Sequence, residues 1–448
     1  MDGFLTFIVA GDKSDVNLGR TTRARFLRSL AYEMRLEKRT FGQADLIAFT
    51  KEFAERHDFD INPLNFIRGF EDQGILHFEA DRVQISLPFI EAYLLAVELA
   101  SRPEDAQRHF VIGEDFDFVT FDLYAEIGAS RSMFNRVCES LEASITELRD
   151  KNGTAHILLG EDIAPMRVRD RKATDRLKKR LQNAIEAVKK GASDLEDKQN
   201  LLDLQDRVRE EAGRQRETQD NEENVAWSER IAPLDRMGTA WTIATVLLGA
   251  GAEHLEASEK RRLSALLIEG AAAFTDEWSR IQSEFDFKGL KEAITTDQAL
   301  EDLPGPDDIE EKRKFVAALV DLFEYQAMAS PIHRTLTFLC EQARHRVLST
   351  SVEAAVSDGL IQNLIKGTWL IDIDPAKGRK PLREAMKALP RSTFLRMTMV
   401  SHYMTRMYWA HGKKEDKLAL LDAADDMLKP LEIDLDKARL KRMIESEG

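Results

Sequence analysis

Cysteine and proline are both scarce in this chain of 448 residues. The two cysteines, Cys138 and Cys340, cannot form a disulfide framework or a structural zinc site, so they predict a reducing, cytoplasmic location. The 12 prolines leave room for long uninterrupted helices, because a proline inside a helix removes a backbone hydrogen bond.

Long apolar runs are also missing. The uncharged run Ala240–Ala252 has 13 residues, against the roughly 20 that a membrane-spanning helix needs. The apolar run Phe4–Ala10 follows the acidic Asp2 and has no basic residue before it, unlike a secretory signal. We therefore expect no membrane span and no targeting segment.

The sequence lacks the common catalytic and cofactor-binding motifs. It contains no GxxxxGK[ST] phosphate loop, no GxGxxG after a strand, and no HExxH, GxSxG or CxxC. We therefore expect no cofactor, no metal centre and no ATP hydrolysis, and no motif names a reaction.

Acidic residues outnumber basic ones. Asp and Glu total 79 and Lys and Arg total 64, which gives a formal net charge of −15 at pH 7. A chain of this charge is not a general nucleic-acid coat, although a local basic stretch could still bind phosphate. Hydrophobic residues make up 43% of the chain, which is enough for a globular, soluble protein.

The first part of the chain has the pattern of a winged helix-turn-helix, at about 22–87 in a predicted domain at 1–110. Apolar residues at helical spacing predict one helix from Thr21, a second over 43–57 and a third over 63–73. Asn62 is a good N-cap for the third helix, because Pro63 then occupies the first helical position.

A β-hairpin is predicted directly after these helices. Gly74 ends the third helix, and two β-prone runs, Ile75–Phe78 and Val83–Ser86, flank a polar turn of four residues. The residues that we expect in the core of this domain are Phe66, Ile67, Phe70, Leu76 and Phe78.

The rest of the chain predicts a mainly α protein. We expect a small helical connector at 111–165, long charged helices in a coiled-coil-like hairpin at 166–226, and an all-α bundle or solenoid-like domain at 227–448. Within that last domain the prolines predict helix breaks at Ser330-Pro331 and over Pro375–Pro381.

The run Ile85–Ala96, ISLPFIEAYLLA, resembles the end of the winged-helix domain in STAND-type NTPases of the NACHT kind. In that family a wing strand leads into an apolar helix with an aromatic residue and Glu-x-Tyr. The resemblance covers roughly residues 20–110, and the family's nucleotide-binding core is not found in this sequence. It implies that this chain corresponds to the part of such a protein that follows the ATPase core. The chain would then be a piece of a longer protein, the product of a split gene or a stand-alone relative. The resemblance also implies a sensor, regulatory or assembly role, with bacterial stress response and phage defence as the setting.

The predicted winged helix offers a recognition face. Its polar and basic members are Asn62, Asn65, Arg68 and Arg82. Acidic residues accompany them in the third helix and the wing, namely Glu71, Asp72, Glu79 and Asp81. This balance repels phosphate, so a structural or protein-contacting role is favoured over DNA reading.

A basic stretch at 167–180 is the second candidate for binding. If it is helical, five of its cations share one face by their spacing, and Arg167 precedes them: Arg169, Lys172, Arg176, Lys179 and Arg180. We expect this face to dock acidic groups of the chain or of a partner, because acidic residues follow at 194–206. Nucleic-acid phosphate is the alternative.

Polar residues of the C-terminal half give weaker candidates for chemistry. His333 and Cys340 are seven residues apart on one helical pattern, about 10 Å, which is too far for a base and its nucleophile. Asp372 and Asp374 could form a paired-acid metal site, but a helix cap beside a basic loop is the simpler interpretation.

The segment from Phe394 to Trp409 is apolar nearly all round and predicts a buried central helix. A groove rich in Met and aromatic residues for a partner is the alternative. His402 and His411 are nine residues apart and lack the acidic companions of a metal site.

Two functions from different classes remain open. The first is a non-catalytic sensor, regulatory or assembly module that binds a protein partner or further copies of itself. The second is a nucleic-acid-binding regulator that uses the winged helix and the basic stretch at 167–180.

Overall fold

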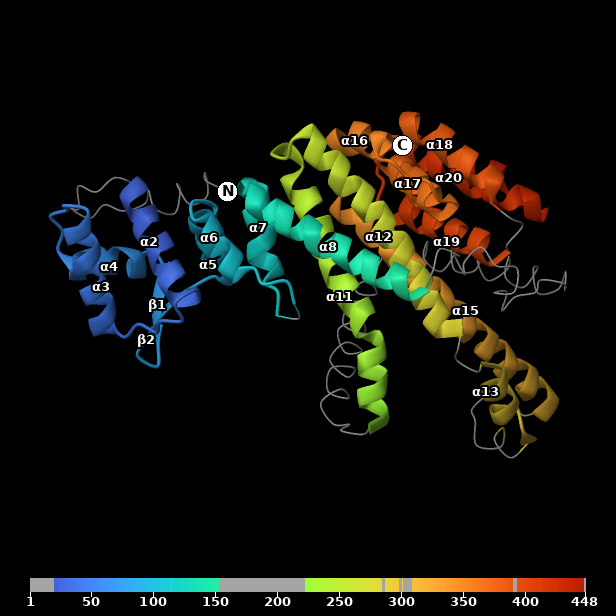
Figure 1. The fold of residues 1–448 in the computed structure, drawn as a ribbon, viewed down its shortest axis with the longest axis horizontal. Helices are drawn as coiled ribbons and strands as arrows, with labels where there is room; N and C mark the ends of the chain where they lie inside the picture. Colours follow the sequence, from blue (N-terminus) through green and yellow to red (C-terminus); the bar gives the residue numbers. More distant parts are fainter. Residues whose placement is uncertain are drawn as a thin grey trace. The chain divides into compact units, whose positions relative to one another are not determined.

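The computed structural model describes residues 20–113, 115–152, 222–283, 287–297, 300, 308–389 and 393–446. These residues are mainly helical, and their one sheet has two strands (Figure 1). The chain divides into two compact units. The first comprises Met1–Ala143, Thr239–Leu267 and Glu341–Ala355, and the second Ser144–Gly238, Ile268–Cys340 and Val356–Gly448. None of the helices in the described ranges is long and apolar enough to cross a bilayer.

Three helices and a hairpin open the first unit, in the predicted order. The helices are α2 (Arg20–Arg35), α3 (Gln43–Arg56) and α4 (Pro63–Asp72), and the strands β1 (Leu76–Glu79) and β2 (Arg82–Ile85) pair antiparallel. The predicted N-cap is confirmed. The Asn62 side-chain oxygen accepts hydrogen bonds from the backbone N–H groups of Leu64 at 3.1 Å and Asn65 at 3.2 Å.

The hairpin turn is tighter than the sequence predicts. Glu79 pairs with Arg82, so the turn consists of Ala80 and Asp81, whose φ angles are 47° and 64°. Two residues of positive φ form a turn whose twist matches that of the flanking strands, which extends the pairing by one residue on each side. The backbone N–H of Val83 also donates to the carbonyl of Phe41 at 2.8 Å and thereby joins β2 to the segment before α3.

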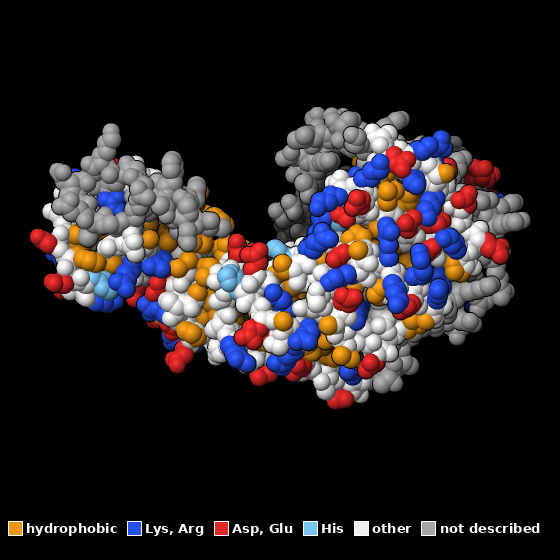
Figure 2. All heavy atoms as spheres, turned by 90° about the horizontal axis from the view of Figure 1, so that it is seen from above, with side chains coloured by type: hydrophobic (Ala, Val, Ile, Leu, Met, Phe, Trp, Pro, Cys, Tyr) orange, Lys and Arg blue, Asp and Glu red, His pale blue; other side chains and the backbone are white. Residues whose placement is uncertain are grey.

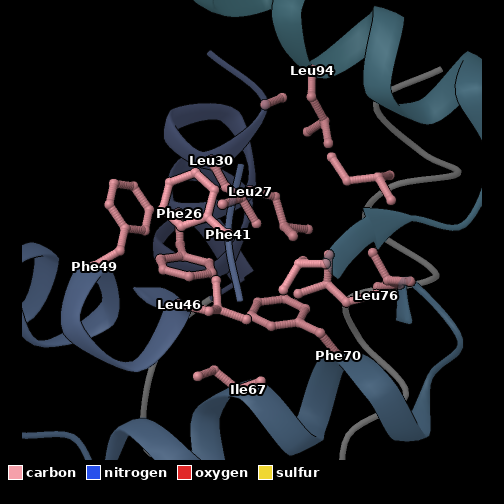
Figure 3. Packing of buried hydrophobic residues seen from close by; sticks show 14 of the residues in the cluster. Phe26, Leu27, Leu30, Phe41, Leu46, Phe49, Ile67, Phe70, Leu76 and Leu94 are labelled. Carbon is pink, nitrogen blue, oxygen red and sulfur yellow. The ribbon is translucent and has the colours of Figure 1, made fainter. Parts of the chain in front are cut away.

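An aromatic core holds these elements together (Figure 3). The Phe26 ring lies 5.0 to 5.7 Å, between centroids, from the rings of Phe49, Phe53, Phe66 and Phe70. Such pairs contribute about 0.5–1.5 kcal/mol each beyond the burial of area. The buried members of the predicted core are Phe66, Ile67, Phe70 and Leu76, and the half-buried member is Phe78.

The next helices run from the hairpin to the middle of the chain. They are α5 (Pro88–Ala100), α6 (Pro103–His109), α7 (Phe118–Gly128), α8 (Arg131–Asn152), α11 (Glu222–Ala250) and α12 (Ala257–Ser283). Helix α5 contacts both α2 and α7. Helix α8 has 22 residues, so the connector expected to contain short helices also contains a long one.

The C-terminal part consists of further helices. They are α13 (Phe287–Ile294), α15 (Ile309–Gln342), α16 (Ser349–Ala354), α17 (Leu360–Ile373), α18 (Pro375–Ala388), α19 (Thr393–Trp409), α20 (Lys414–Leu428) and α21 (Lys437–Ser446). Short 3-10 turns lie at Gly251–Glu253, Arg346–Leu348 and Lys429–Leu431. Helix α19 is buried along most of its length, as its apolar stripe predicts, although Trp409 at its end is exposed.

Two prolines lie inside helices where the sequence predicts breaks. Helix α15 continues through Pro331, and α18 continues through Pro381. A proline inside a helix costs about 3 kcal/mol. Around Pro331 the side chains of Met328, Ile332 and Leu336 are buried, and burial of each contributes about 1.5–3 kcal/mol, so packing outweighs the lost hydrogen bond.

Candidate functional site

The predicted recognition face lies on the exposed side of α4 and on the hairpin. Asn65, Arg68 and Arg82 are exposed there, so they are available to a partner. Asn62 is exposed as well, but its side-chain oxygen is engaged in the helix cap. The apolar side chain of Leu64 lies among these residues and is 48% exposed. The sequence pattern of charged residues did not predict this exposed apolar side chain.

Acidic side chains accompany this face in the structure. Asp72, Glu79 and Asp81 are exposed, and Glu71 is half-buried. Arg82 pairs through its backbone with Glu79, so a carboxylate lies beside this cation of the hairpin. The face is therefore partly apolar and partly acidic, as suits a protein surface better than a phosphate backbone.

More apolar side chains are exposed at the beginnings of α5 and α7. Leu87, just before α5, is 52% exposed, and Phe89 in the first turn of α5 is 47% exposed. In α7, Phe118 is 37% exposed and Val119 is 60% exposed. Burial raises the pKa of Glu91 against the opposing charge of Arg35, which lies 3.1 Å away, and the negative charge of Asp117 raises it further. Figure 2 shows hydrophobic side chains on the surface of this part of the chain.

The second predicted site lies outside the described residues. It is the basic stretch with Arg167, Arg169, Lys172, Arg176, Lys179 and Arg180.

A buried ionic cluster joins three of the C-terminal helices. The Arg406 guanidinium donates from Nε to Asp372 Oδ1 and from Nη2 to Asp372 Oδ2, both at 3.0 Å. His411 Nε2 lies 2.9 Å from Asp372 Oδ1, and His411 Nδ1 lies 3.5 Å from Asp416 Oδ2. The side chains of Asp372, Arg406 and His411 are at most 2% exposed, so these three are cut off from solvent, whereas that of Asp416 is 24% exposed.

The cluster is electrostatically satisfied. Burial by itself would raise the pKa of Asp372, but hydrogen bonds from His411 and Arg406 together with their charges lower it to about 2. Arg406 Nη2 also donates to the backbone carbonyl of Cys340 at 3.2 Å. Both oxygens of the carboxylate thus have partners, which is the condition under which a buried ion pair is tolerated.

The structure separates the two aspartates that the sequence pairs. Asp372 binds Arg406, whereas the Asp374 side chain caps α18 by accepting a hydrogen bond from the Ala376 N–H at 3.2 Å, as the cap interpretation predicts. No group of three or more His, Cys, Asp or Glu side chains in the described ranges could hold a metal ion. The contact between Asp372 and His411 was not predicted, because 39 residues separate them.

His402 lies fully buried beside this cluster. Its pKa is lowered to about 3, chiefly by burial, and its Nδ1 has no hydrogen-bond partner among the described residues. The His333 ring lies 5.7 Å away between centroids, and burial lowers the pKa of His333 too. A side chain as fully buried as that of His402 cannot reach a dissolved substrate.

Stability is expected to fall as the pH is lowered from about 7 to about 4. The unfolded chain takes up a proton on His402 near the ordinary pKa of 6.5, whereas the folded protein does so only near 3, so acid favours the unfolded chain between these values. Asp372 adds to the loss below 3.8, its ordinary pKa. Thermal melting across this range checks the trend, and His402→Leu should flatten it. An identical pH profile in that variant would contradict the assignment.

Comparisons with known proteins do not indicate a function, so the function is argued from the structure. No protein-family model matches the sequence, and neither a curated protein nor a solved structure gave a match.

Proposed function

We propose that this protein is a non-catalytic regulatory or assembly module that contacts another protein through its N-terminal domain. In this proposal α2, α3, α4 and the hairpin form a winged helix. The order of these elements supports it, and so does the hydrogen bond from Val83 to Phe41, which joins the hairpin to the segment before α3.

The exposed apolar side chains of this domain carry the proposal. Leu64 lies on the helix that a DNA-reading winged helix would insert into the major groove, and exposed acidic residues follow it at Asp72, Glu79 and Asp81. Leu87 and Phe89 add further exposed apolar surface where the hairpin leads into α5. Aromatic side chains such as Phe89 are enriched in the cores of protein interfaces.

The resemblance to STAND-type NTPases extends this proposal. The resembling run, Ile85–Ala96, includes the exposed Phe89 at the start of α5. The protein partner in this proposal is accordingly a nucleotide-binding core, supplied by the same protein, by a neighbouring gene product or by a larger assembly, and phage defence is the proposed setting. An ATPase core encoded next to this gene would support the assignment.

The nucleic-acid regulator is the second candidate. The exposed Arg68 and Arg82 favour it, since both are free to approach phosphate from α4 and the hairpin. In that case the charge reversals Arg68→Glu and Arg82→Glu would weaken duplex binding.

Site-specific photo-crosslinking tests the protein-contact proposal in the cells that contain the protein. A photoreactive phenylalanine analogue replaces Leu64 or Phe89, and an exposed polar position of α3, Lys51, serves as the matched control. We expect adducts with one defined protein from positions 64 and 89 and none from position 51. Adducts with nucleic acid, or the same adducts from all three positions, would reject the proposal.

A further inference from the structure

Helix α18 carries a row of positive charge on its exposed side. Arg379, Arg383 and Lys387 follow one another at intervals of four residues, and Lys380 lies beside the first of them. All four side chains are exposed, and Glu384 is the one acidic residue of the helix. At 1.5 Å per residue the row extends over about 12 Å.

The surface around this helix is rich in cations. Helix α18 lies at the top of Figure 1, and Figure 2, which views the molecule from above, shows Lys and Arg side chains gathered over the part at the right with Asp and Glu among them. Helix α18 itself has five basic residues and one acidic residue, so it differs in sign from the whole chain, whose formal charge is −15.

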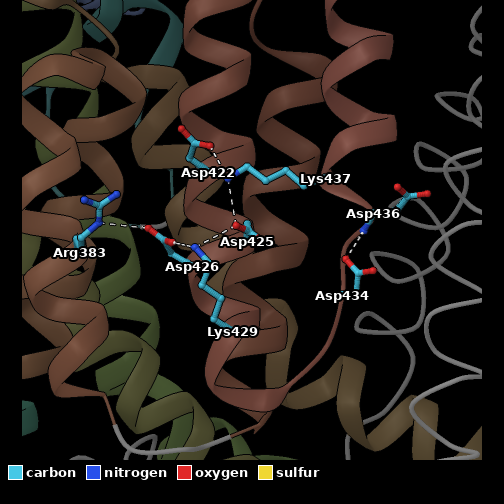
Figure 4. A network of polar contacts seen from close by, with 8 residues as sticks. All are labelled: Arg383, Asp422, Asp425, Asp426, Lys429, Asp434, Asp436 and Lys437. Atoms are coloured by element: carbon cyan, nitrogen blue, oxygen red, sulfur yellow. Dashed lines mark hydrogen bonds and ion pairs between the residues drawn. The ribbon is translucent and has the colours of Figure 1, made fainter.

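The acidic residues closest to the row already have cationic partners (Figure 4). Lys437 Nζ lies 2.8 Å from Asp422 and 3.1 Å from Asp425. Lys429 Nζ lies 3.1 Å from Asp425 and 2.5 Å from Asp426. Two lysines outside α18 therefore neutralise part of the charge of these three carboxylates of α20.

One cation of the row contributes to this network and three do not. Arg383 Nε lies 3.3 Å from Asp426 Oδ2. Within the described ranges, the side chains of Arg379, Lys380 and Lys387 take part in no hydrogen bond or ion pair. These three side chains are exposed and available to an anion from outside.

The backbone of α18, which carries this basic row, is held in place by close packing against α17. A Cβ atom at Gly378 would lie 2.3 Å from the Ile371 Cα, and one at Gly367 would lie 2.7 Å from the Leu382 Cα, so α17 and α18 are in direct backbone contact. A shallow groove of about 50 Å³ lies between α18 and α20, and it is lined by Arg379, Leu382 and Arg383 of α18 and by Asp422 and Asp426 of α20. Because the helix is held in place, binding an anion requires ordering of side chains only.

We propose that the exposed face of α18 binds the phosphodiester backbone of a nucleic acid without regard to sequence. A nucleic acid carries closely and regularly spaced charges and releases condensed counterions when cations replace them, which gives a straight basic row substantial affinity. Exposed ion pairs with protein carboxylates contribute little free energy, so an acidic protein gains less from the same row. The negative charge elsewhere is screened beyond about 8 Å at physiological salt.

This site is separate from the protein-contacting face of the proposed function. It lies in a stretch that the sequence suggested was a helix break with a basic loop, and it uses neither the predicted winged helix nor the stretch at 167–180. Failure of one proposal therefore leaves the other intact.

Fluorescence anisotropy of the full chain with a labelled random-sequence duplex tests the proposal. The variant carries the reversals Arg379→Glu, Lys380→Glu and Lys387→Glu. For about three phosphate contacts, the affinity of the unaltered protein should fall about 40-fold between about 50 and about 200 mM salt. The triple variant should lose at least about tenfold in affinity at the lower salt and have a flatter salt dependence.

Matched controls assign the binding to α18. Reversals at three exposed lysines of the same unit, Lys413, Lys414 and Lys441, change the net charge equally and should leave most of the affinity. The pair Arg176→Glu and Lys179→Glu tests the basic stretch in the same way. No binding at low salt, equal losses in either control, or tighter binding of labelled poly-glutamate than of the duplex would overturn the proposal. The last result would identify an acidic protein as the partner.

Discussion

Replacing Asp372 by alanine is expected to lower the thermal midpoint of the protein by about 5–9 °C, because breaking a buried ion pair costs about 3–5 kcal/mol. The substitution removes the carboxylate that holds both Nε and Nη2 of Arg406 at 3.0 Å. The guanidinium is 2% exposed, so water cannot replace the lost partner without opening the helices around it.

Two further variants distinguish the lost partner from lost packing. Asp372→Leu combined with Arg406→Met removes both charges and keeps apolar volume, so it should recover most of the stability. Glu52→Ala breaks the exposed pair with Arg56, in which both side chains are more than half exposed, and should change the free energy of unfolding by at most about 1 kcal/mol. Thermal melting of all three variants checks the comparison. Equal shifts for Asp372→Ala and Glu52→Ala would contradict the structural role of the cluster.

The buried cluster could not be predicted from the sequence because its contacts are long-range. Arg406 is 34 residues from Asp372 and 66 from the Cys340 carbonyl to which it also donates. Periodicity and capping patterns act over a few residues and contain no information on such pairs. One signal was present: Arg406 is a charged residue inside an otherwise apolar stripe, and a charge in such a place needs a partner.

The N-terminal elements were predictable because their signals are local. The Asn62-Pro63 cap, the break at Gly74 and the aromatic residues at helical spacing specify α4 within a few residues of chain. The same local rules failed for α18. There Pro375, Gly378 and Pro381 together indicate a break, yet Pro375 occupies the first turn of the helix, where proline is favourable, and Gly378 is required by the contact with α17.

The second large effect is expected from Gly378→Ala. Helix propensity alone favours alanine over glycine by about 1 kcal/mol, so an ordinary helix position would gain stability. Here the new Cβ would lie 2.3 Å from both Cα and N of Ile371 and 2.7 Å from the backbone carbon of Leu370. Backbone atoms inside a helix cannot rotate away, so α17 and α18 must separate and Leu382 and Met386, now buried, lose part of their packing.

We therefore expect Gly378→Ala to destabilise the protein by about 3 kcal/mol, the upper end of the usual range for overpacking, and to lower its thermal midpoint. Gly412→Ala is the matched control, because a Cβ at Gly412 meets no atom within 4 Å. Thermal melting of the two variants distinguishes close backbone contact, which predicts a loss of stability at position 378, from ordinary helix propensity, which predicts a gain. If α18 is held against α17 by direct backbone contact, the substitution at 378 is costly and that at 412 is nearly neutral. If both substitutions raise the midpoint or leave it unchanged, the backbones of α17 and α18 are not in direct contact. In that case no such contact holds the basic row of α18 in place.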